Sequence, residues 1–254
     1  MPGSKFAVAW DRFSGLDWAG MNISQIKFGL GLGMSLTALM ALGLTGCKTS
    51  RRSAFRWDHI EGTVRVACIG DSITYGSGVE GRETNCYPAV LGKLMGSKFE
   101  VKNFGVSGAT LLKKGDKPYW TQPEFNQASA YGPHLVIIKL GTNDTKDQNW
   151  KHGAEFEANL KEMIEHFTRL PSRPKVWVCF PVPVYETQWS INDDTLAHGV
   201  IPAIKRAAHQ SHAPIIDLYE ALSNRPDLFP DKVHPNAAGA QLIARTIESA
   251  LFLR

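Results

Sequence analysis

Four short segments of the sequence contain residue types that act together in nucleophilic catalysis. They are Gly70-Asp71-Ser72, Gly105 in the stretch 103–108, Asn143 in the stretch 141–144, and Asp231 with His234 three residues later. A serine hydroxyl becomes a nucleophile when a histidine removes its proton, and a carboxylate can hold that histidine in the required tautomer. Backbone N–H groups and an amide side chain can stabilise the oxyanion that forms when a carbonyl is attacked. Together, the segments predict acyl transfer through a serine.

Each segment also has an ordinary structural interpretation. Aspartate, serine and asparagine are common at helix N-caps, and glycine is common in turns. The catalytic interpretation is favoured because all four segments lie either at the end of a predicted strand or just before the last predicted helix.

The elements that must position these residues follow an alternating pattern. Short β-branched runs predict strands at 64–70, 99–105, 134–141, 175–181 and 213–218, and apolar periodicity predicts helices at about 155–170 and 237–252. Strands separated by helices imply a parallel sheet covered on both faces, which is a three-layer α/β domain. Ligands of such sheets bind at the carboxyl ends of the strands, where the four segments are expected.

The four segments resemble the sequence blocks of the SGNH hydrolases, also called GDSL esterases. The resemblance covers about residues 64–250. It implies a flavodoxin-like sandwich whose five-stranded parallel sheet has the strand order 2-1-3-4-5.

The resemblance also implies a role for each residue. Ser72 would be the nucleophile, His234 the general base, and Asp231 the group that orients the imidazole. The N–H groups of Ser72 and Gly105 and the amide of Asn143 would form the oxyanion hole. The family needs no metal or other cofactor, and the sequence contains no HExxH or CxxC motif.

The substrate is less closely defined, since the family acts on acetylated sugars, lysophospholipids, thioesters and simple esters. Tyr119 and Trp120 lie in a polar insertion, and Tyr185 and Trp189 follow the fourth predicted strand. Exposed aromatic rings among polar residues suit stacking on sugars, which favours hydrolysis of acetyl esters on a carbohydrate such as sialate or xylan. The alternatives are aromatic rings that only pack the loops, a lysophospholipase or thioesterase, and a non-catalytic glycan-binding lipoprotein.

A leader precedes this domain. Residues 28–46 are uncharged, and Leu44-Thr45-Gly46 before Cys47 resembles the lipobox of bacterial lipoproteins. We therefore expect a signal peptide over 1–46, with Met21 as an alternative start, a lipidated tether over 47–62, and a catalytic domain over 63–254. Acyl chains on Cys47 would anchor an exported protein to a bacterial membrane. An uncleaved transmembrane helix is the alternative.

Composition limits the remaining possibilities. A net charge of +4, scattered along the chain, is too small for a nucleic-acid binder, and no protein partner can be inferred. With Cys47 lipidated, Cys68, Cys86 and Cys179 remain. In the strand order 2-1-3-4-5, Cys68 and Cys179 would lie two strands and ~9.6 Å apart, too far for a disulfide. Both are expected to be buried packing residues, and the state of Cys86 is open.

Overall fold

The structure is a computed structural model that describes Trp57 and residues 60–252. The predicted signal peptide, Cys47 and most of the predicted tether lie outside the described residues, so lipidation stays a prediction. Within this part of the chain, no helix has the length and apolar character required to span a membrane.

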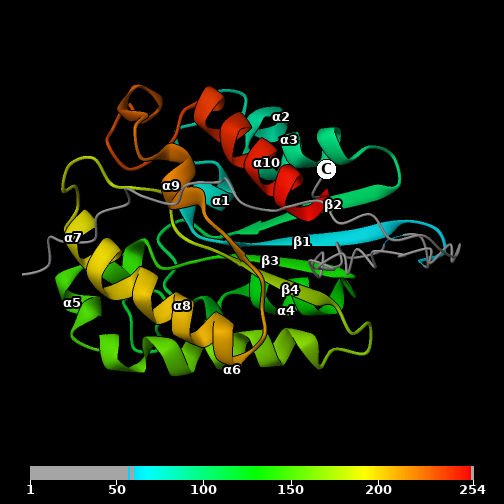
Figure 1. Ribbon diagram of the computed structural model, residues 1–254, viewed down its shortest axis with the longest axis horizontal. Helices are drawn as coiled ribbons and strands as arrows, with labels where there is room; N and C mark the ends of the chain where they lie inside the picture. The colour runs from blue at the N-terminus through cyan, green and yellow to red at the C-terminus, as the bar shows by residue number, and fades with distance from the viewer. Residues whose placement is uncertain (1–56, 58–59, 253–254) are drawn as a thin grey trace, which may run out of the picture. The chain divides into compact units, whose positions relative to one another are not determined.

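One parallel sheet forms the centre of the domain (Figure 1). Its strands are β1 (Val64–Gly70), β2 (Phe99–Gly105), β3 (Leu135–Lys139), β4 (Lys175–Cys179) and β5 (Ile215–Ile216). Their order is β2-β1-β3-β4-β5, and every neighbouring pair is parallel. This arrangement confirms the predicted topology.

The strand boundaries differ most from the prediction at β5. This strand lies at the sheet edge and pairs only with β4. The expected strand 213–218 is shorter because Pro214 has no N–H for the ladder and Asp217 begins the next helix by accepting a hydrogen bond from the Glu220 N–H at 2.8 Å.

Helices cover both faces of the sheet (Figure 1). On one face lie α1 (Ser72–Tyr75), α2 (Arg82–Asn85), α3 (Tyr87–Met95), α9 (Leu218–Leu222) and α10 (Ala237–Phe252), and on the other α4 (Pro123–Ala130), α6 (Phe156–Thr168) and α8 (Ile201–Gln210). Each face of the sheet has its own hydrophobic core, and alternate residues of β1 point into one or the other. Val66 and Cys68 pack on the side of α3 and α10, whereas Ala67 and Ile69 pack on the side of α6 and α8.

The remaining helical segments are short and were not predicted. They are η1 (Tyr119–Thr121), η2 (Asn143–Thr145), α5 (Asp147–Trp150), η3 (Gly153–Glu155), α7 (Asp193–Thr195), η4 (Leu196–Val200) and η5 (Pro226–Leu228). With three to five residues each, they give almost no periodic signal in the sequence.

The two long predicted helices correspond to α6 and α10. In α6 the apolar residues that predicted its inner face are all buried: Phe156, Leu160, Met163, Ile164 and Phe167. Leu170 lies just beyond the helix end and packs partly buried against the same core. Since the periodic face and the burial coincide, apolar packing explains why this segment is helical.

The three described cysteines are free thiols. Cys68 and Cys179 are fully buried in the sheet as expected, and burial raises the pKa of Cys179 to about 12. Cys86 is also buried, and its sulfur accepts a hydrogen bond from the Asn103 amide at 3.5 Å. All three therefore act as packing residues.

Candidate active site

Ser72 lies where β1 turns sharply into α1. Asp71 caps this helix, its Oδ1 accepting a hydrogen bond from the Ile73 N–H at 3.0 Å. Ser72 is the first helical residue, so its own N–H has no acceptor within the helix and remains available at the carboxyl edge of the sheet. The turn therefore presents both the hydroxyl and an N–H donor at one position.

His234 and Asp231 come from the loop before α10 and meet Ser72 there. His234 Nε2 lies 2.8 Å from Ser72 Oγ, and His234 Nδ1 lies 2.7 Å from Asp231 Oδ2. The other carboxylate oxygen, Oδ1, accepts hydrogen bonds from the N–H groups of Val233 at 3.0 Å and His234 at 2.6 Å. The structure thus brings the three predicted residues into one hydrogen-bonded chain.

The protonation of this chain follows from the carboxylate. Burial tends to raise the pKa of Asp231, but the hydrogen bonds from His234 and Val233 outweigh it and hold that pKa below its ordinary value. An ionised carboxylate can only accept, so Nδ1 must donate the hydrogen bond to it. In the neutral imidazole, Nε2 then has a free lone pair that faces the Ser72 hydroxyl. Ser72 can therefore lose its proton directly to His234.

Asn143 begins η2, shortly after β3, and is almost fully buried. Its Nδ2 donates to the Ala109 carbonyl at 3.0 Å, and its backbone carbonyl accepts from Asn149 Nδ2 at 2.8 Å. A primary amide carries two hydrogens, so one N–H of Asn143 stays available for a ligand. This agrees with the donor role expected from the sequence.

Gly105 does not have the role predicted for it. Its N–H donates to Asn103 Oδ1 at 2.9 Å, so this group is not free to bind an oxyanion. A Cβ at this position would lie 2.2 Å from the backbone nitrogen of Tyr75. Glycine is therefore required here because β2 and α1 approach closely, which is a packing requirement.

Gly108, three residues later, has the free N–H that the prediction assigned to Gly105. Its φ is +81°, and its N–H has no partner within the described part of the chain. The residue before it, Ser107, contacts Ser77 with 3.0 Å between the hydroxyl oxygens, and the residue after it, Ala109, accepts the bond from Asn143. Gly108 thus lies between the end of α1 and Asn143. The second glycine of the stretch 103–108 was the signal that sequence reasoning missed.

Two of the four predicted substrate-binding aromatic residues are parts of the protein interior. Tyr119 is fully buried, and its hydroxyl donates to the Phe104 carbonyl at 2.7 Å. Trp120 is partly buried against Phe125, and its Nε1 donates to the Leu111 carbonyl at 2.8 Å. The prediction that Tyr119 stacks on a sugar is wrong, and Trp120 packs its own loop.

The aromatic residues after β4 differ from each other. The Tyr185 hydroxyl donates to the Leu222 carbonyl, and its ring packs 5.1 Å from Phe229, so Tyr185 also packs its loop. Trp189 is 60% exposed, and its ring centroid lies 5.7 Å from that of His234. Of the four, Trp189 is the one that the structure brings to the candidate site as an exposed ring.

Trp189 stands at the tip of a two-residue hairpin. Gln188 and Ile191 exchange backbone hydrogen bonds of 3.2 and 2.8 Å, and the two residues between them, Trp189 and Ser190, have φ values of 51° and 62°. Such a turn normally uses Asn and Gly, because side chains with a Cβ are strained at positive φ. The loop therefore holds a bulky ring at a strained position beside the histidine.

Lys139 was not anticipated. This last residue of β3 is fully buried, with Nζ 3.1 and 3.2 Å from the two Asp71 carboxylate oxygens and 3.2 Å from Thr142 Oγ1. Burial lowers the pKa of Lys139, and the Asp71 carboxylate opposes that shift. A lysine within an apolar strand was the available signal, because a buried ammonium requires a partner.

A second buried carboxylate supports the loop that follows β2. Asp144, next to Asn143, accepts hydrogen bonds from the N–H groups of Leu111 at 3.0 Å and Leu112 at 2.7 Å. Burial raises the pKa of Asp144 to about 7, against the lowering effect of those two donors. Asp144 therefore ties the loop containing Gly108 to the segment containing Asn143.

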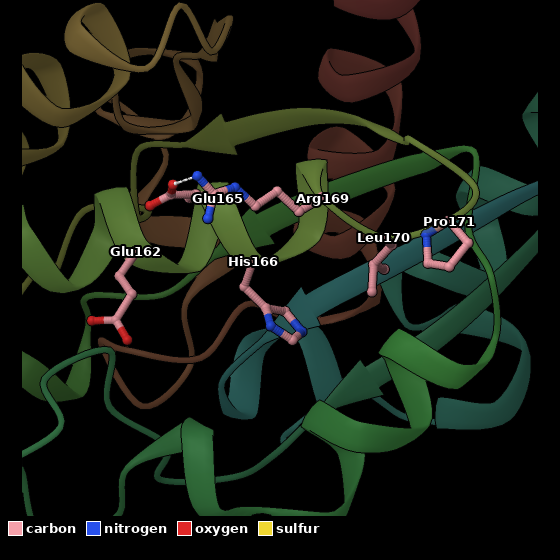
Figure 2. Close-up of a pocket in the computed structure, with 6 residues that line it drawn as sticks. All are labelled: Glu162, Glu165, His166, Arg169, Leu170 and Pro171. Carbon is pink, nitrogen blue, oxygen red and sulfur yellow. Dashed lines mark ion pairs between the residues drawn. The ribbon is translucent and has the colours of Figure 1, made fainter.

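A surface hollow on α6 is separate from this constellation. Figure 2 shows that its lining comes from the last part of the helix and the residues after it: Glu162, Glu165, His166, Arg169, Leu170 and Pro171. An ion pair joins Glu165 to Arg169 within it, and His166 Nε2 lies 2.8 Å from Ser129 Oγ. The end of α6 leads into β4 at the amino edge of the sheet, whereas Ser72 lies at the carboxyl edge. Among the described residues, no group of three or more His, Cys, Asp or Glu could hold a metal ion.

Comparison with known proteins gives two curated relatives. The chain is 39% identical over 209 residues to an acetylxylan esterase from Xylanibacter ruminicola, covering 75% of this chain and 44% of that protein. It is 22% identical over 253 residues to a multidomain esterase from Ruminococcus flavefaciens, covering 87% of this chain and 31% of that protein. The chain thus spans less than half the length of either relative.

Solved structures share the fold. A carbohydrate acetylesterase family member from Sinorhizobium meliloti has a TM-score of 0.59 at 21% identity, over 75% of this chain and 98% of that one. The acetyl xylan esterase AlAXEase has a TM-score of 0.59 at 22% identity, over 74% and 100% of the two chains. The native aryl esterase of M. smegmatis has a TM-score of 0.59 at 20% identity, over 74% and 99%. The GDSL-like lipase/acylhydrolase family model matches residues 68–242, more than half of the chain, and the protein therefore belongs to that family, as its four sequence segments predicted.

Proposed function

We propose that this protein is a serine esterase that removes acetyl groups from a carbohydrate. The observation that carries the proposal is the hydrogen-bonded chain from Ser72 Oγ through His234 to Asp231, with distances of 2.8 and 2.7 Å. This arrangement activates a hydroxyl for attack on a carbonyl.

In the first half of the reaction, Ser72 Oγ bonds to the acetyl carbonyl carbon while its proton passes to His234 Nε2. The carbonyl electron pair moves onto oxygen, and the oxyanion accepts hydrogen bonds from the N–H groups of Ser72 and Gly108 and from the amide of Asn143. When the tetrahedral adduct collapses, the C–O bond to the sugar breaks, and the sugar oxygen takes the proton from His234. Acetyl-Ser72 and a free sugar hydroxyl result.

In the second half, a water molecule attacks acetyl-Ser72 and gives its proton to His234. Collapse of this second adduct breaks the bond to Ser72 Oγ, which takes the proton back from His234, and the product leaves as acetic acid, which ionises to acetate in water. Asp231 stays ionised throughout and stabilises the imidazolium that forms twice in the cycle.

Two observations support a carbohydrate as the alcohol part of the ester. The relative with 39% identity is an acetylxylan esterase. Trp189 also offers an exposed ring 5.7 Å from the His234 ring, where the alcohol part of the substrate must lie if His234 protonates it.

The experiment that tests the proposal measures acetate released from acetylated xylan and from O-acetylated sialic acid. Wild type should release acetate, and Ser72→Ala should not. Ser211 lies just after α8, and Ser211→Ala should release as much acetate as wild type. A series of aryl esters should show activity falling from two to eight acyl carbons. No acetate release, or activity that peaks at eight carbons, would contradict the proposal, and the second result would favour a lysophospholipase or thioesterase.

We also propose that Cys47 carries a lipid anchor that places the exported enzyme on a bacterial membrane. The proposal rests on the uncharged run 28–46 and on Leu44-Thr45-Gly46 before the cysteine. Mass spectrometry of the protein from membranes should find an acylated Cys47 at the N-terminus, and Cys47→Ala should remain uncleaved. A Cys47→Ala protein whose leader is removed as in wild type would refute the anchor.

A further inference from the structure

The ammonium of Lys139 is a buried charge with a distinctive set of partners. It hydrogen-bonds to both carboxylate oxygens of Asp71 and to the hydroxyl of Thr142, at 3.1, 3.2 and 3.2 Å. All three side chains are buried, and the ion pair is fully shielded from solvent. The three donors of the ammonium are thus all used within this cluster.

The partners lie next to two of the three proposed oxyanion donors. Asp71 directly precedes Ser72, whose N–H is one donor, and Thr142 directly precedes Asn143, whose amide is another. These two segments follow different strands, β1 and β3, and Lys139 and Asp71 are 68 residues apart in the sequence. One ammonium therefore connects two backbone segments that have to stand at a fixed separation.

Stability alone gives a weak reason for a buried ion pair. Desolvation of two charges offsets much of their attraction, and apolar residues of similar volume are often at least as stabilising. The α1 cap does not need the charge on Asp71 either, since a neutral asparagine oxygen can accept the bond from the Ile73 N–H. What the pair does provide is geometry, because each of its hydrogen bonds is directional and no water competes for it.

We propose that Lys139 is a positioning residue that sets the distance between the Ser72 N–H and the Asn143 amide. This inference rests on the proposed function. Both donors must lie about 2.7–3.1 Å from the oxyanion at the same time, so a shift of one segment weakens at least one bond. A misplacement of about 1 Å is expected to lower the rate by about 10²-fold.

The effect should be specific to the transition state. The oxyanion forms only after Ser72 attacks. Misalignment of the donors that bind it therefore lowers kcat and leaves KM nearly unchanged. For the same reason, a boronic acid that forms a tetrahedral adduct on Ser72 should bind more weakly to a variant with a displaced donor. A purely structural role for Lys139 would change neither quantity in a variant that remains folded.

The test introduces Lys139→Met together with Asp71→Asn into the full-length protein. Lys139→Met alone leaves a carboxylate buried without its partner and is expected to unfold more readily. The double variant removes both charges, while the amide oxygen introduced by Asp71→Asn can still cap α1. We expect a folded protein with kcat on an aryl acetate about 10²-fold lower, KM within about twofold, and weaker inhibition by phenylboronic acid. The double variant Arg206→Met with Glu157→Gln removes an ion pair between α8 and α6 and should behave like wild type.

The outcomes separate this inference from the proposed function. If wild type lacks Ser72-dependent esterase activity, the proposed function fails. If wild type is active and the folded double variant keeps its kcat and its boronic acid affinity, the role of Lys139 is overturned alone. Should the double variant not fold, Thr142→Val decides, because it removes one partner of Lys139 and leaves the ion pair intact. A wild-type kcat in Thr142→Val would overturn the inference, and a fall of about tenfold at unchanged KM would support it.

Discussion

The indole of Trp189 should contribute to the selection of a carbohydrate substrate. Trp189 is 60% exposed and its ring lies beside His234, so a ligand at the site can reach the indole. A tryptophan side chain has a surface of about 200–250 Å². If 60% of it is exposed and a sugar covers half of the exposed part, about 70 Å² of apolar surface is removed from water. At about 25 cal/mol per Å², this is roughly 1.8 kcal/mol, or about a 20-fold change in kcat/KM.

The substitution must remove the ring without collapsing the hairpin. Trp189 and Ser190 both have positive φ, and asparagine tolerates that conformation better than most residues. We therefore expect Trp189→Asn to keep the loop and to lower kcat/KM on acetylated xylo-oligosaccharides by about 20-fold. Ethyl acetate is too small to cover an indole, so its hydrolysis, followed by pH-stat titration, should stay within about twofold of wild type.

The matched control is Trp120→Ala. Trp120 packs its own loop and donates to the Leu111 carbonyl, so its removal should lower the melting temperature while the ratio of the two kcat/KM values stays as in wild type. If Trp189→Asn lowers kcat/KM equally on the oligosaccharide and on ethyl acetate, the ring acts on His234 and does not bind sugar. No fall on the oligosaccharide would refute the stacking argument.

Three further changes follow from the same site. Asn143→Ala should lower kcat on aryl acetates by about 10²- to 10³-fold with little change in KM, as steady-state kinetics can measure, because one oxyanion donor is lost. Gly105→Ala should lower the unfolding temperature in calorimetry, because the added Cβ would lie 2.2 Å from the Tyr75 nitrogen, and an unfolding temperature equal to that of wild type would contradict the packing requirement. Since the pKa of Asp231 is lowered in the folded state, its contribution to stability is present above the ordinary aspartate pKa and is lost as pH falls through the lowered value. In denaturant titrations, Asp231→Asn should therefore be less stable than wild type at neutral pH, and this difference should disappear in strong acid.

Much of the fold was predictable because its signals are local. The runs 64–70 and 99–105 are β-branched or alternating and end at glycines, and the structure has strands with those bounds. His234 and Asp231 are three residues apart, so one turn brings them together without long-range information. The contact between His234 and Ser72 depends on the topology of the whole sheet, and that topology was predicted from the strand order that the resemblance implies.

The burial of Tyr119 could not be derived in this way. Residues 106–118 fold back on themselves, with the Thr110 N–H donating to the Lys117 carbonyl and the Tyr119 N–H donating to the Thr110 carbonyl. Because the segment folds back in this way, the Tyr119 ring points into the core, where its hydroxyl donates to the Phe104 carbonyl. Polar neighbours in sequence predicted an exposed loop, but tertiary packing decides which side of a polar loop holds its aromatic ring.

The choice between Gly105 and Gly108 depends on a single side chain. Both glycines lie at or after the end of β2, and either N–H could in principle face Ser72. Asn103 removes the first from consideration, because its Oδ1 accepts from Gly105 while its Nδ2 donates to the Thr74 carbonyl at 2.8 Å. An asparagine two residues before a glycine commonly makes this type of local bond, so the sequence did contain a reason to prefer Gly108.

Lys139 shows how a violation of the strand pattern can be informative. A β-strand with neighbours on both sides is normally apolar throughout, and the strand Leu135–Lys139 fits that pattern except at this residue. Since an unpaired ammonium is not tolerated in a core, a lysine there requires a carboxylate at the same depth in the sheet. In a parallel sheet that carboxylate must come from a neighbouring strand or the turn after it, and Asp71, after the neighbouring β1, meets the condition. The exception in the pattern therefore leads from the strand to Asp71, which precedes the proposed nucleophile Ser72.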